Sequence, residues 1–394
     1  MTERNLNFGK YVDRNKTNCI KFDSADERHK PSGLLSYWVA DMDFRVSSYI
    51  EDAISEVAAR GIFGYSTPDE RYFAAVERWM RTRHRFEVSE DWLVKTPGIV
   101  FALAQAVRAF TNPGDAVIVQ QPVYYPFSDV TRENDRRLVV SELVCGPDGR
   151  YEIDFDDFEA KIKENDVKLF ILCSPHNPVG RVWTRDELTR LGEICAKNRV
   201  IVVSDEIHND FVFQGEHTVF ETIAPEFADF TVTCTSPSKT FNIAGLQASN
   251  VFIQNEELRG KFFAACQASG YCELNPFGIA AVVAAYEHGD VWRDAMMKYV
   301  EENMAFVVDY LAREIPCART RMNEGTYLMW LDFRASGLSD DEIESKMLYE
   351  AKLWLDGGSM FGKSGRCFQR LNVACSRWYL ERGLARMKNA FGML

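Results

Sequence analysis

The chain lacks a long apolar run, a secretory leader and any paired-cysteine motif. No stretch reaches the roughly 18 apolar residues of a membrane-spanning helix, and the N-terminal Met-Thr-Glu-Arg-Asn-Leu-Asn is polar rather than signal-like. The ten cysteines include no Cys-x-x-Cys pair, and the six histidines show no metal-ligand spacing. We therefore expect no membrane association and no metal, and the scattered cysteines favour a reducing cytoplasm.

A surplus of positive charge is also missing. Lysine and arginine number 46 against 58 aspartate and glutamate residues, which gives a net charge of −12. Because polyanions bind basic surfaces, this balance argues against nucleic acid and anionic membranes as partners. The sequence has no internal repeat, low-complexity segment or long linker. Its 394 residues predict two domains, or one large α/β domain with an accessory lobe.

Apolar patterning through the middle of the chain predicts alternating strands and helices. The predicted strands are 116–119, 169–173, 200–204 and 230–235. The predicted helices are 99–111 and 184–198, the second with Thr184 as N-cap and Glu187 three residues later. This order predicts a largely parallel sheet covered on both faces. Beyond about residue 286 we expect a smaller domain, with helices near 290–313 and 340–353 and strands at 327–332 and 368–373.

Lys239 is the most informative single residue. It lies in the run Ser-Pro-Ser-Lys directly after the predicted strand 230–235, and a helix-like apolar run containing Gly245 follows it. A lysine at a strand end suits pyridoxal phosphate, because its amine can bond to the cofactor aldehyde while Ser236 and Ser238 hydrogen-bond the phosphate. Taken alone, the motif fits a solvated turn lysine about equally well.

Four other polar or aromatic groups follow predicted strands or open a predicted helix. Asn177 and Asp205 each follow a buried strand, Tyr124 follows the strand 116–119, and the turn 96–98 opens the helix at 99. The carboxyl ends of parallel strands meet at one edge of a sheet, where ligands of such sheets gather. Each group has an ordinary structural explanation as a cap, a turn or a core residue. Their joint occurrence favours a cofactor site.

The segment 357–364, Gly-Gly-Ser-Met-Phe-Gly-Lys-Ser, matches the nucleotide-binding P-loop pattern. A P-loop must follow a strand and open a helix, whereas this segment leads into the predicted strand 368–373. We therefore interpret it as a glycine-rich loop before a strand.

Several ordered motifs together resemble the fold-type I pyridoxal phosphate enzymes, the aspartate aminotransferase superfamily. Within that superfamily the chain is similar to the cystathionine β-lyase (C–S lyase) branch that includes the MalY and PatB proteins. The resemblance spans nearly the whole chain and rests on segments 38–44, 96–100, 122–127, 174–180, 204–211, 236–246 and 370–374.

The resemblance implies a fold and a domain organisation. The implied fold is α/β and aspartate aminotransferase-like, with a large cofactor domain built on a mainly parallel seven-stranded sheet and a smaller α/β C-terminal domain. Residues 46–285 would form the large domain and 286–394 the small one, joined by the N-terminal segment 1–45. The resemblance also implies a homodimer with a shared active site.

The resemblance further implies catalytic roles for Lys239, Tyr124 and Asp205. Lys239 would bind the cofactor covalently and then take the substrate Cα proton. Asp205 would pair with the pyridine nitrogen, and Tyr124 would stack on the ring. Asn177 would hydrogen-bond the phenolic oxygen of the ring.

Other residues receive binding roles from the same resemblance. The implied contacts to the cofactor phosphate come from Ser236, Ser238, Gly98, Ile99 and Val100 of the same chain. Tyr65 would reach the phosphate and substrate of the neighbouring subunit. The implied contacts to the substrate itself come from Arg370, which would clamp the α-carboxylate, and from Val39 and Ala40.

Two residues depart from the aminotransferase pattern. The resemblance implies a cofactor contact for His208, which stands where a tyrosine is common in aminotransferases, and Gln247 stands where many of them have a phosphate-binding arginine. Both departures favour a lyase that converts L-cystathionine or another L-cysteine S-conjugate to a thiol, pyruvate and ammonia. A class I/II aminotransferase is the alternative, since one fold supports both reactions. A regulatory role through protein contact is a third hypothesis.

Overall fold

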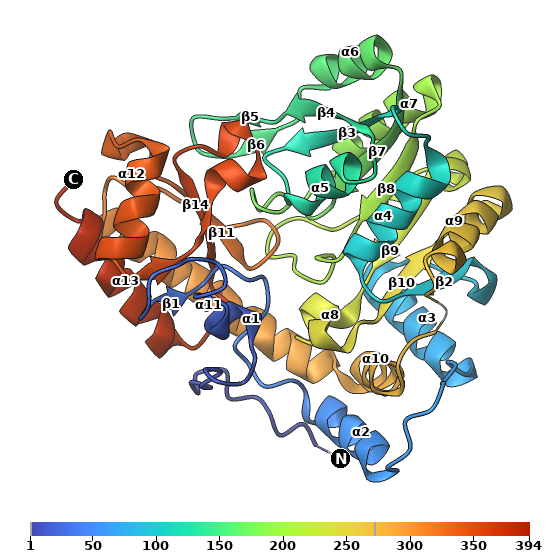
Figure 1. Ribbon diagram of the computed structural model, residues 1–394, viewed down its shortest axis with the longest axis horizontal. Helices are drawn as coiled ribbons and strands as arrows, with labels where there is room; N and C mark the ends of the chain where they lie inside the picture. Colours follow the sequence, from blue (N-terminus) through green and yellow to red (C-terminus); the bar gives the residue numbers. More distant parts are fainter. Residues whose placement is uncertain (1, 272) are drawn as a thin grey trace.

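The computed structural model describes residues 2–271 and 273–394 (Figure 1). At its centre lies a seven-stranded sheet in the order β2-β10-β9-β8-β7-β3-β4. The strands are β2 (Leu93–Thr96), β3 (Ala116–Gln121), β4 (Arg137–Glu142), β7 (Val167–Cys173), β8 (Ile201–Asp205), β9 (Thr231–Thr235) and β10 (Ser249–Phe252). Strand β10 runs antiparallel to both of its neighbours, β2 and β9, and the pairs among β9, β8, β7, β3 and β4 are parallel. The predicted mainly parallel α/β sheet is confirmed.

Helices cover both faces of this sheet (Figure 1). On one face Ala116 and Ile118 of β3 pack in a cluster with α6 (Phe155–Asn165) and α7 (Arg185–Asn198). On the other face Val117 and Val119 pack with the remaining helices of that layer. Those helices are α4 (Ile99–Phe110), α5 (Pro126–Arg132) and α9 (Glu256–Ala268). Burial on both faces explains why these strands read as continuous apolar runs.

The capping box predicted for the helix after β7 is present at the start of α7. The Thr184 hydroxyl accepts from the Glu187 backbone N–H at 3.2 Å, and the Glu187 carboxylate accepts from the Thr184 N–H at 2.8 Å. These two bonds satisfy backbone donors that the first helical turn leaves open.

A second group of helices lies beside the sheet and leads to the C-terminal part. Helices α2 (Ser48–Ala59) and α3 (Glu70–His84) each pack against α10 (Pro276–His288). The long helix α11 (Asp290–Glu314) continues from α10, as the sequence predicts. Their apolar faces belong to one core cluster that extends into the C-terminal part.

The C-terminal part contains a three-stranded antiparallel sheet in the order β11-β14-β13. Its strands are β11 (Leu328–Asp332), β13 (Asp356–Gly357) and β14 (Phe368–Asn372), and helix α13 (Arg377–Phe391) closes the chain. Strand β1 (Leu35–Ser36) pairs in parallel with β12 (Leu353–Trp354), which ties the N-terminal segment to this part (Figure 1). The domain boundaries near residues 45 and 285 stay predictions.

Short elements complete the structure. They are α1 (Ile20–Asp23), α8 (Pro237–Thr240), α12 (Asp340–Ser345), β5 (Val144–Cys145) and β6 (Tyr151–Glu152).

Two predicted helical stretches are wrong. The helix expected at 340–353 ends at Ser345, widens into a π-helical turn and then gives way to β12, because Leu353 and Trp354 pair with β1. The helix-like run after Lys239 is only the short α8 and one 3-10 turn at Ala244–Leu246. Between these two, Asn242 adopts a left-handed conformation (φ 58°) and its amide donates to the carbonyls of Met42 and Phe44.

The P-loop-like segment has no helix of the required kind. It forms two short 3-10 turns, Gly358–Phe361 and Lys363–Gly365, and β14 follows. A Cβ atom on Gly358 would lie 1.9 Å from the Gly365 carbonyl oxygen, so glycine is needed for this backbone contact. The loop interpretation is confirmed.

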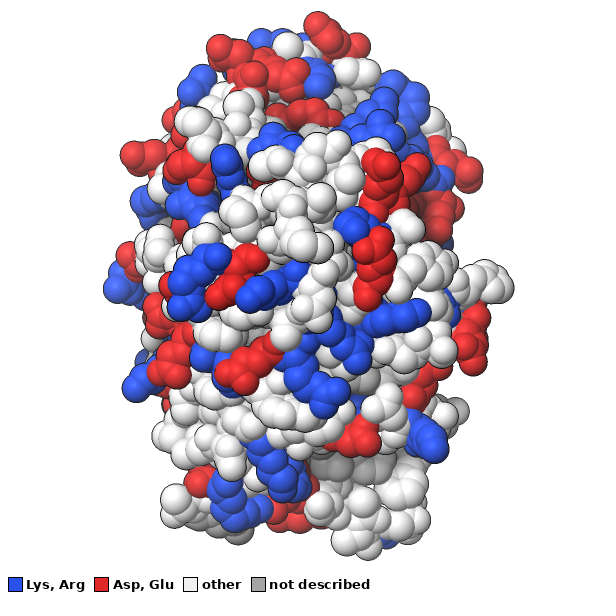
Figure 2. Space-filling model, turned by 90° about the vertical axis from the view of Figure 1, so that its left-hand side faces the viewer, with Lys and Arg blue, Asp and Glu red and all other residues white. Residues whose placement is uncertain are grey.

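The surface carries charges of both signs. Figure 2 shows acidic and basic side chains interspersed over the face that lies at the left in Figure 1. Within residues 2–271 and 273–394, no helix combines the length and the apolarity needed to cross a membrane.

Candidate active site

The carboxyl ends of three parallel strands lie level with one another. Cys173 at the end of β7 is opposite Asp205 at the end of β8, and Asp205 is opposite Cys234 in β9. The segments that follow these strands therefore meet at one edge of the sheet, where they border a cavity of about 400 Å³. Its lining includes Ala40, Gly98, Ile99, Val100, Tyr124, Asn177, Asp205, His208, Ser238 and Lys239.

Lys239 lies in α8, with its amine at this cavity. The amine donates to the Ala40 carbonyl oxygen at 2.7 Å. Burial lowers the pKa of Lys239 to about 8; Asp41 opposes that shift, whereas the charge of Arg370 adds to it. A substantial fraction of the amine is therefore neutral near pH 8, which makes it a nucleophile and a base.

Asp205 is the last residue of β8 and is only 4% exposed. Its Oδ1 accepts from the Ile207 backbone N–H at 3.1 Å. Burial raises the pKa of Asp205 to about 7, against the opposing effects of that hydrogen bond and of Lys239. A buried carboxyl with so high a pKa is suited to hold a cationic partner.

Asn177 connects Tyr124 and Arg370. Its backbone carbonyl accepts from the Tyr124 N–H at 3.0 Å, and its side-chain Oδ1 accepts from Arg370 Nη1 at 3.1 Å. Because Oδ1 is engaged with Arg370, the Nδ2 group is the part of the amide that can donate to a ligand.

His208 lies in the lining with a buried, neutral ring. Burial lowers the pKa of His208 to about 3, and the nearby charges of Lys239 and Arg370 act in the same direction. Its Nδ1 is buried and has no hydrogen-bond partner among the described residues. The unpartnered Nδ1 of this neutral imidazole can hydrogen-bond a bound group.

The N-terminal end of α4 and the short helix α8 border one end of the cavity. The donors at this end suit an anion. Gly98 caps α4, and the backbone N–H groups of its first turn are not used by helical hydrogen bonds. Ser238 also lines the cavity, whereas Ser236 does not. The Ser236 hydroxyl donates to the Ala248 carbonyl at 2.9 Å and accepts from the Ser238 N–H at 3.1 Å. The predicted phosphate contact of Ser236 therefore competes with a helix-capping role.

Three other predicted residues lie outside the lining. Arg370 is buried behind Asn177, and Val39 presents its carbonyl to the Asn372 amide at 2.7 Å. Tyr65 lies in the segment between α2 and α3 with its side chain fully exposed, and it is not in the lining of this chain's own cavity.

Sequence reasoning assigned no role to Tyr327 or Asp41. The Tyr327 hydroxyl donates to the Ala40 carbonyl at 2.8 Å, the same oxygen that accepts from Lys239. The charge of Asp41 raises the pKa of Lys239. Tyr327 starts a predicted strand remote from the cofactor motifs, so no local pattern marks it. Asp41 belongs to segment 38–44, one of the segments on which the family resemblance rests, and this could have marked it as a site residue.

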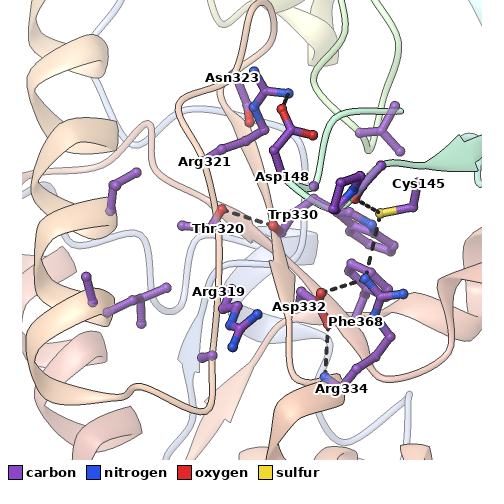
Figure 3. A pocket seen from close by; sticks show the side chains of 18 of the residues that line it. Cys145, Asp148, Arg319, Thr320, Arg321, Asn323, Trp330, Asp332, Arg334 and Phe368 are labelled. Atoms are coloured by element: carbon purple, nitrogen blue, oxygen red, sulfur yellow. Dashed lines mark hydrogen bonds and ion pairs between the residues drawn. The ribbon is translucent and has the colours of Figure 1, made fainter. Parts of the chain in front are cut away.

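A larger cavity of about 620 Å³ lies apart from this site (Figure 3). It opens between the loop that carries Cys145 and Asp148 and the segment from Arg319 to Asp332. None of the predicted site residues belongs to its lining.

Comparisons with known proteins place the chain in a family. Residues 39–387 match the family model for "Aminotransferase class I and II". The chain is 45% identical to the cystathionine beta-lyase PatB of Bacillus subtilis (strain 168), over 98% of this chain and 100% of PatB. It is 31% identical to protein MalY of Escherichia coli (strain K12), over 98% of each chain.

A solved structure gives the same result. The PLP-bound C–S lyase of Staphylococcus hominis superimposes with a TM-score of 0.91 and 34% identity, over 98% of each chain. Because the family model covers most of the chain and the relatives match it nearly end to end, the chain belongs to the class I and II aminotransferase family, in the group that contains PatB and MalY.

Proposed function

We propose that this protein is a pyridoxal 5'-phosphate-dependent C–S β-lyase. It cleaves L-cystathionine or another L-cysteine S-conjugate to a thiol, pyruvate and ammonia. One structural observation carries the proposal: the amine of Lys239 and the buried carboxyl of Asp205 face one cavity at the carboxyl edge of the sheet. The kinship with PatB, which is named a cystathionine beta-lyase, supports the reaction type.

The residues present fit pyridoxal phosphate. Asp205 has no cationic side chain within hydrogen-bonding distance among the described residues, and its raised pKa matches a carboxyl that pairs with a pyridine nitrogen. The first turn of α4 and Ser238 supply donors for a phosphate group. Lys239 supplies the amine that bonds to the aldehyde, and the unpartnered Nδ1 of His208 supplies one more polar contact.

When bound, pyridoxal phosphate supplies an electron sink that stabilises negative charge at the substrate Cα. Asp205 would hold its carboxylate against the pyridine nitrogen and so favour the protonated ring that acts as this sink. Tyr124 lies in the lining, where its ring can stack on the cofactor. Arg370 binds the substrate α-carboxylate and so orients the Cα–H bond.

Lys239 moves the proton. With a pKa of about 8, its Nζ accepts a proton from the substrate Cα near neutral pH and holds it beside the Ala40 carbonyl. The departing β-thiolate is a good leaving group and can take up a proton from the same amine. The remaining three-carbon fragment hydrolyses to pyruvate and ammonia.

The lyase is favoured over an aminotransferase at two positions. Gln247 lines the cavity where many aminotransferases place a phosphate-binding arginine, and His208 is neutral where they place a tyrosine. Two relatives, from Bacillus subtilis and Corynebacterium glutamicum, are named cystathionine beta-lyases, at 45% and 30% identity. An aspartate aminotransferase from Sulfolobus acidocaldarius is only 24% identical.

We also propose a homodimer with shared active sites. The segment between α2 and α3 exposes Ile62, Phe63 and Tyr65, with Ile62 83% exposed. Apolar side chains gathered on an exposed segment are typical of an interface. This exposure supports a contact in which Tyr65 completes the site of the neighbouring subunit.

A cytoplasmic location stays a prediction. The nine cysteines within the described part of the chain are free thiols, which is compatible with a reducing compartment. The absence of nucleic acid and membrane partners likewise stays an expectation from the negative net charge.

The proposed function is tested by supplying L-cystathionine to the purified holoenzyme with and without a keto acid. A lyase releases pyruvate at the same rate in both cases, because no amino acceptor enters the reaction. Turnover that depends strictly on the keto acid would identify an aminotransferase and would contradict the proposal.

A further inference from the structure

The guanidinium group of Arg370 is held from three sides. Its Nη1 donates to Asn177 Oδ1 at 3.1 Å, and its Nη2 donates to the Trp38 carbonyl at 2.8 Å and also to Asp356 Oδ2. The Phe361 ring lies 4.9 Å from the guanidinium carbon. Only Nε is buried without a partner among the described residues. This arrangement leaves the Nε–H as a buried donor without a partner.

Within residues 2–271 and 273–394, Asp356 is the one carboxylate paired with this guanidinium. It lies directly opposite Arg370 in the antiparallel pair β13–β14, so the two side chains project from the same face of the sheet. The two side chains are 3% and 2% exposed. A buried arginine that loses such a partner keeps an uncompensated charge and an unfixed side chain.

We propose that Asp356 is a positioning residue that orients Arg370 for the substrate α-carboxylate. The Asp356 carboxylate accepts from Nη2 and thereby fixes the plane of the guanidinium, which leaves the Nε–H for the substrate. This role rests on the proposed function of Arg370. Asp356 lies outside the cavity lining and acts through Arg370.

Charge balance gives a second reason for an acid at this position. Before substrate binds, Asp356 offsets the charge of Arg370 in a region from which water is largely excluded. The hydrogen bond fixes orientation, whereas the charge sets how strongly the guanidinium attracts a second anion. Asp356→Asn keeps a hydrogen-bond acceptor at this position and removes the charge. This variant therefore separates the contribution of the hydrogen bond from that of the charge.

A purely structural ion pair is the competing explanation. In that case Asp356 would only hold β13 against β14, and its loss would weaken the fold without regard to the chemistry of the ligand. Two ligands that differ only in a carboxylate distinguish these explanations. Glycine and methylamine are such a pair, because both present the same primary amine.

The test measures binding of glycine and of methylamine to the holoenzyme by absorbance titration. Asp356→Ala should weaken glycine binding by about tenfold or more, the scale of a lost hydrogen bond to a charged group. It should leave methylamine binding within about twofold of wild type. Asp356→Asn should restore glycine binding to within about threefold of wild type.

Asp332→Ala is the matched control. Asp332 lies in the same sheet and pairs with Arg334 at 2.8 Å, at the rim of the other cavity. It should leave the binding of both ligands unchanged. A urea unfolding curve for each variant verifies that the compared proteins are folded.

Three outcomes would overturn the positioning role. They are glycine binding that Asp356→Ala does not change, equal weakening of glycine and methylamine, and failure of Asp356→Asn to restore glycine binding. Failure of the proposed lyase function shows itself separately, in a wild-type enzyme that releases no pyruvate from L-cystathionine. The two failures are therefore distinguishable.

Discussion

At the residue scale, the environment of Lys239 differs from that of an ordinary surface lysine. Its amine contacts the Ala40 carbonyl at 2.7 Å, and burial lowers its pKa to about 8. The same burial raises the pKa of Asp205 to about 7. Burial therefore moves both pKa values toward neutrality, which is the range in which proton transfer works at physiological pH.

Replacing Lys239 with alanine should reduce pyruvate release by about a thousandfold or more, because it removes both the covalent anchor and the base. Borohydride treatment of the holoenzyme followed by mass spectrometry should no longer attach the cofactor to the protein. Lys197→Ala is the control, since Lys197 lies on the outer surface of α7 and pairs with Glu159. Lyase activity that survives in Lys239→Ala at near wild-type rate would contradict the assignment.

Asp205→Asn should stabilise the cofactor-free protein in a pH-dependent way. The pKa of Asp205 is about 7 in the folded protein against its usual 3.8, so between these values the folded state binds the proton more tightly. The free energy of unfolding of wild type therefore falls as pH rises from about 4 to about 7. The variant lacks this loss and should gain on the order of 2–4 kcal/mol at pH 8, and less at pH 5.

Urea unfolding of the two proteins at both pH values measures this difference. Asp229→Asn, at an exposed position, serves as the control and should show no such pH trend. A gain of equal size at pH 5 and pH 8 would show that Asp205 does not titrate in this range.

Some site residues were predictable because their signal is local. Asp205 ends β8, and Asn177 and Lys239 lie in the segments that follow β7 and β9; strand ends in a parallel sheet meet at one edge. Asp356 and Tyr327 were not predictable in this way. The contact of Asp356 with Arg370 depends on the register of β13 against β14. The contact of Tyr327 with Ala40 depends on packing between segments far apart in the sequence.

At the element scale, the central strands β3, β7, β8 and β9 were predictable because burial on both faces gives largely apolar runs, whereas β2, β4 and β10 were not predicted. The residue at which α12 ends was not predictable, because the pairing of Leu353 and Trp354 with β1 overrides the local helical pattern. The capping box of α7 was fully predictable from the sequence, since its two partners are three residues apart.

Thr184→Ala should therefore destabilise the protein by about 1 kcal/mol, the usual cost of losing an N-cap side chain. Thr184→Ser keeps the hydroxyl and should retain most of the stability. Chemical denaturation of the two variants measures the difference. Equal stability of the alanine variant and wild type would show that the capping hydrogen bonds contribute nothing.

At the scale of the whole molecule, the proposed shared site requires two subunits. A dimer of the 45.1 kDa chain has a mass of about 90 kDa, twice the single-chain value. The exposed segment with Ile62, Phe63 and Tyr65 should be covered in that dimer. The regulatory role considered from the sequence stays a prediction.

Mixed dimers test the sharing of the sites. A Lys239→Ala subunit paired with a Tyr65→Ala subunit contains one site with both residues intact, if Tyr65 acts in the neighbouring subunit. Refolding the two inactive or weakened variants together should then restore activity, up to about half of the wild-type activity in each mixed dimer. No recovery in dimers verified as mixed would place Tyr65 outside the neighbouring site.

The most direct test of the central claim is the product stoichiometry of the purified holoenzyme acting on L-cystathionine, without any keto acid present. The account predicts pyruvate, ammonia and thiol in equal amounts and continued turnover over many cycles. It is contradicted if the thiol and pyruvate are absent, or if the reaction stops after one equivalent per site until a keto acid is added.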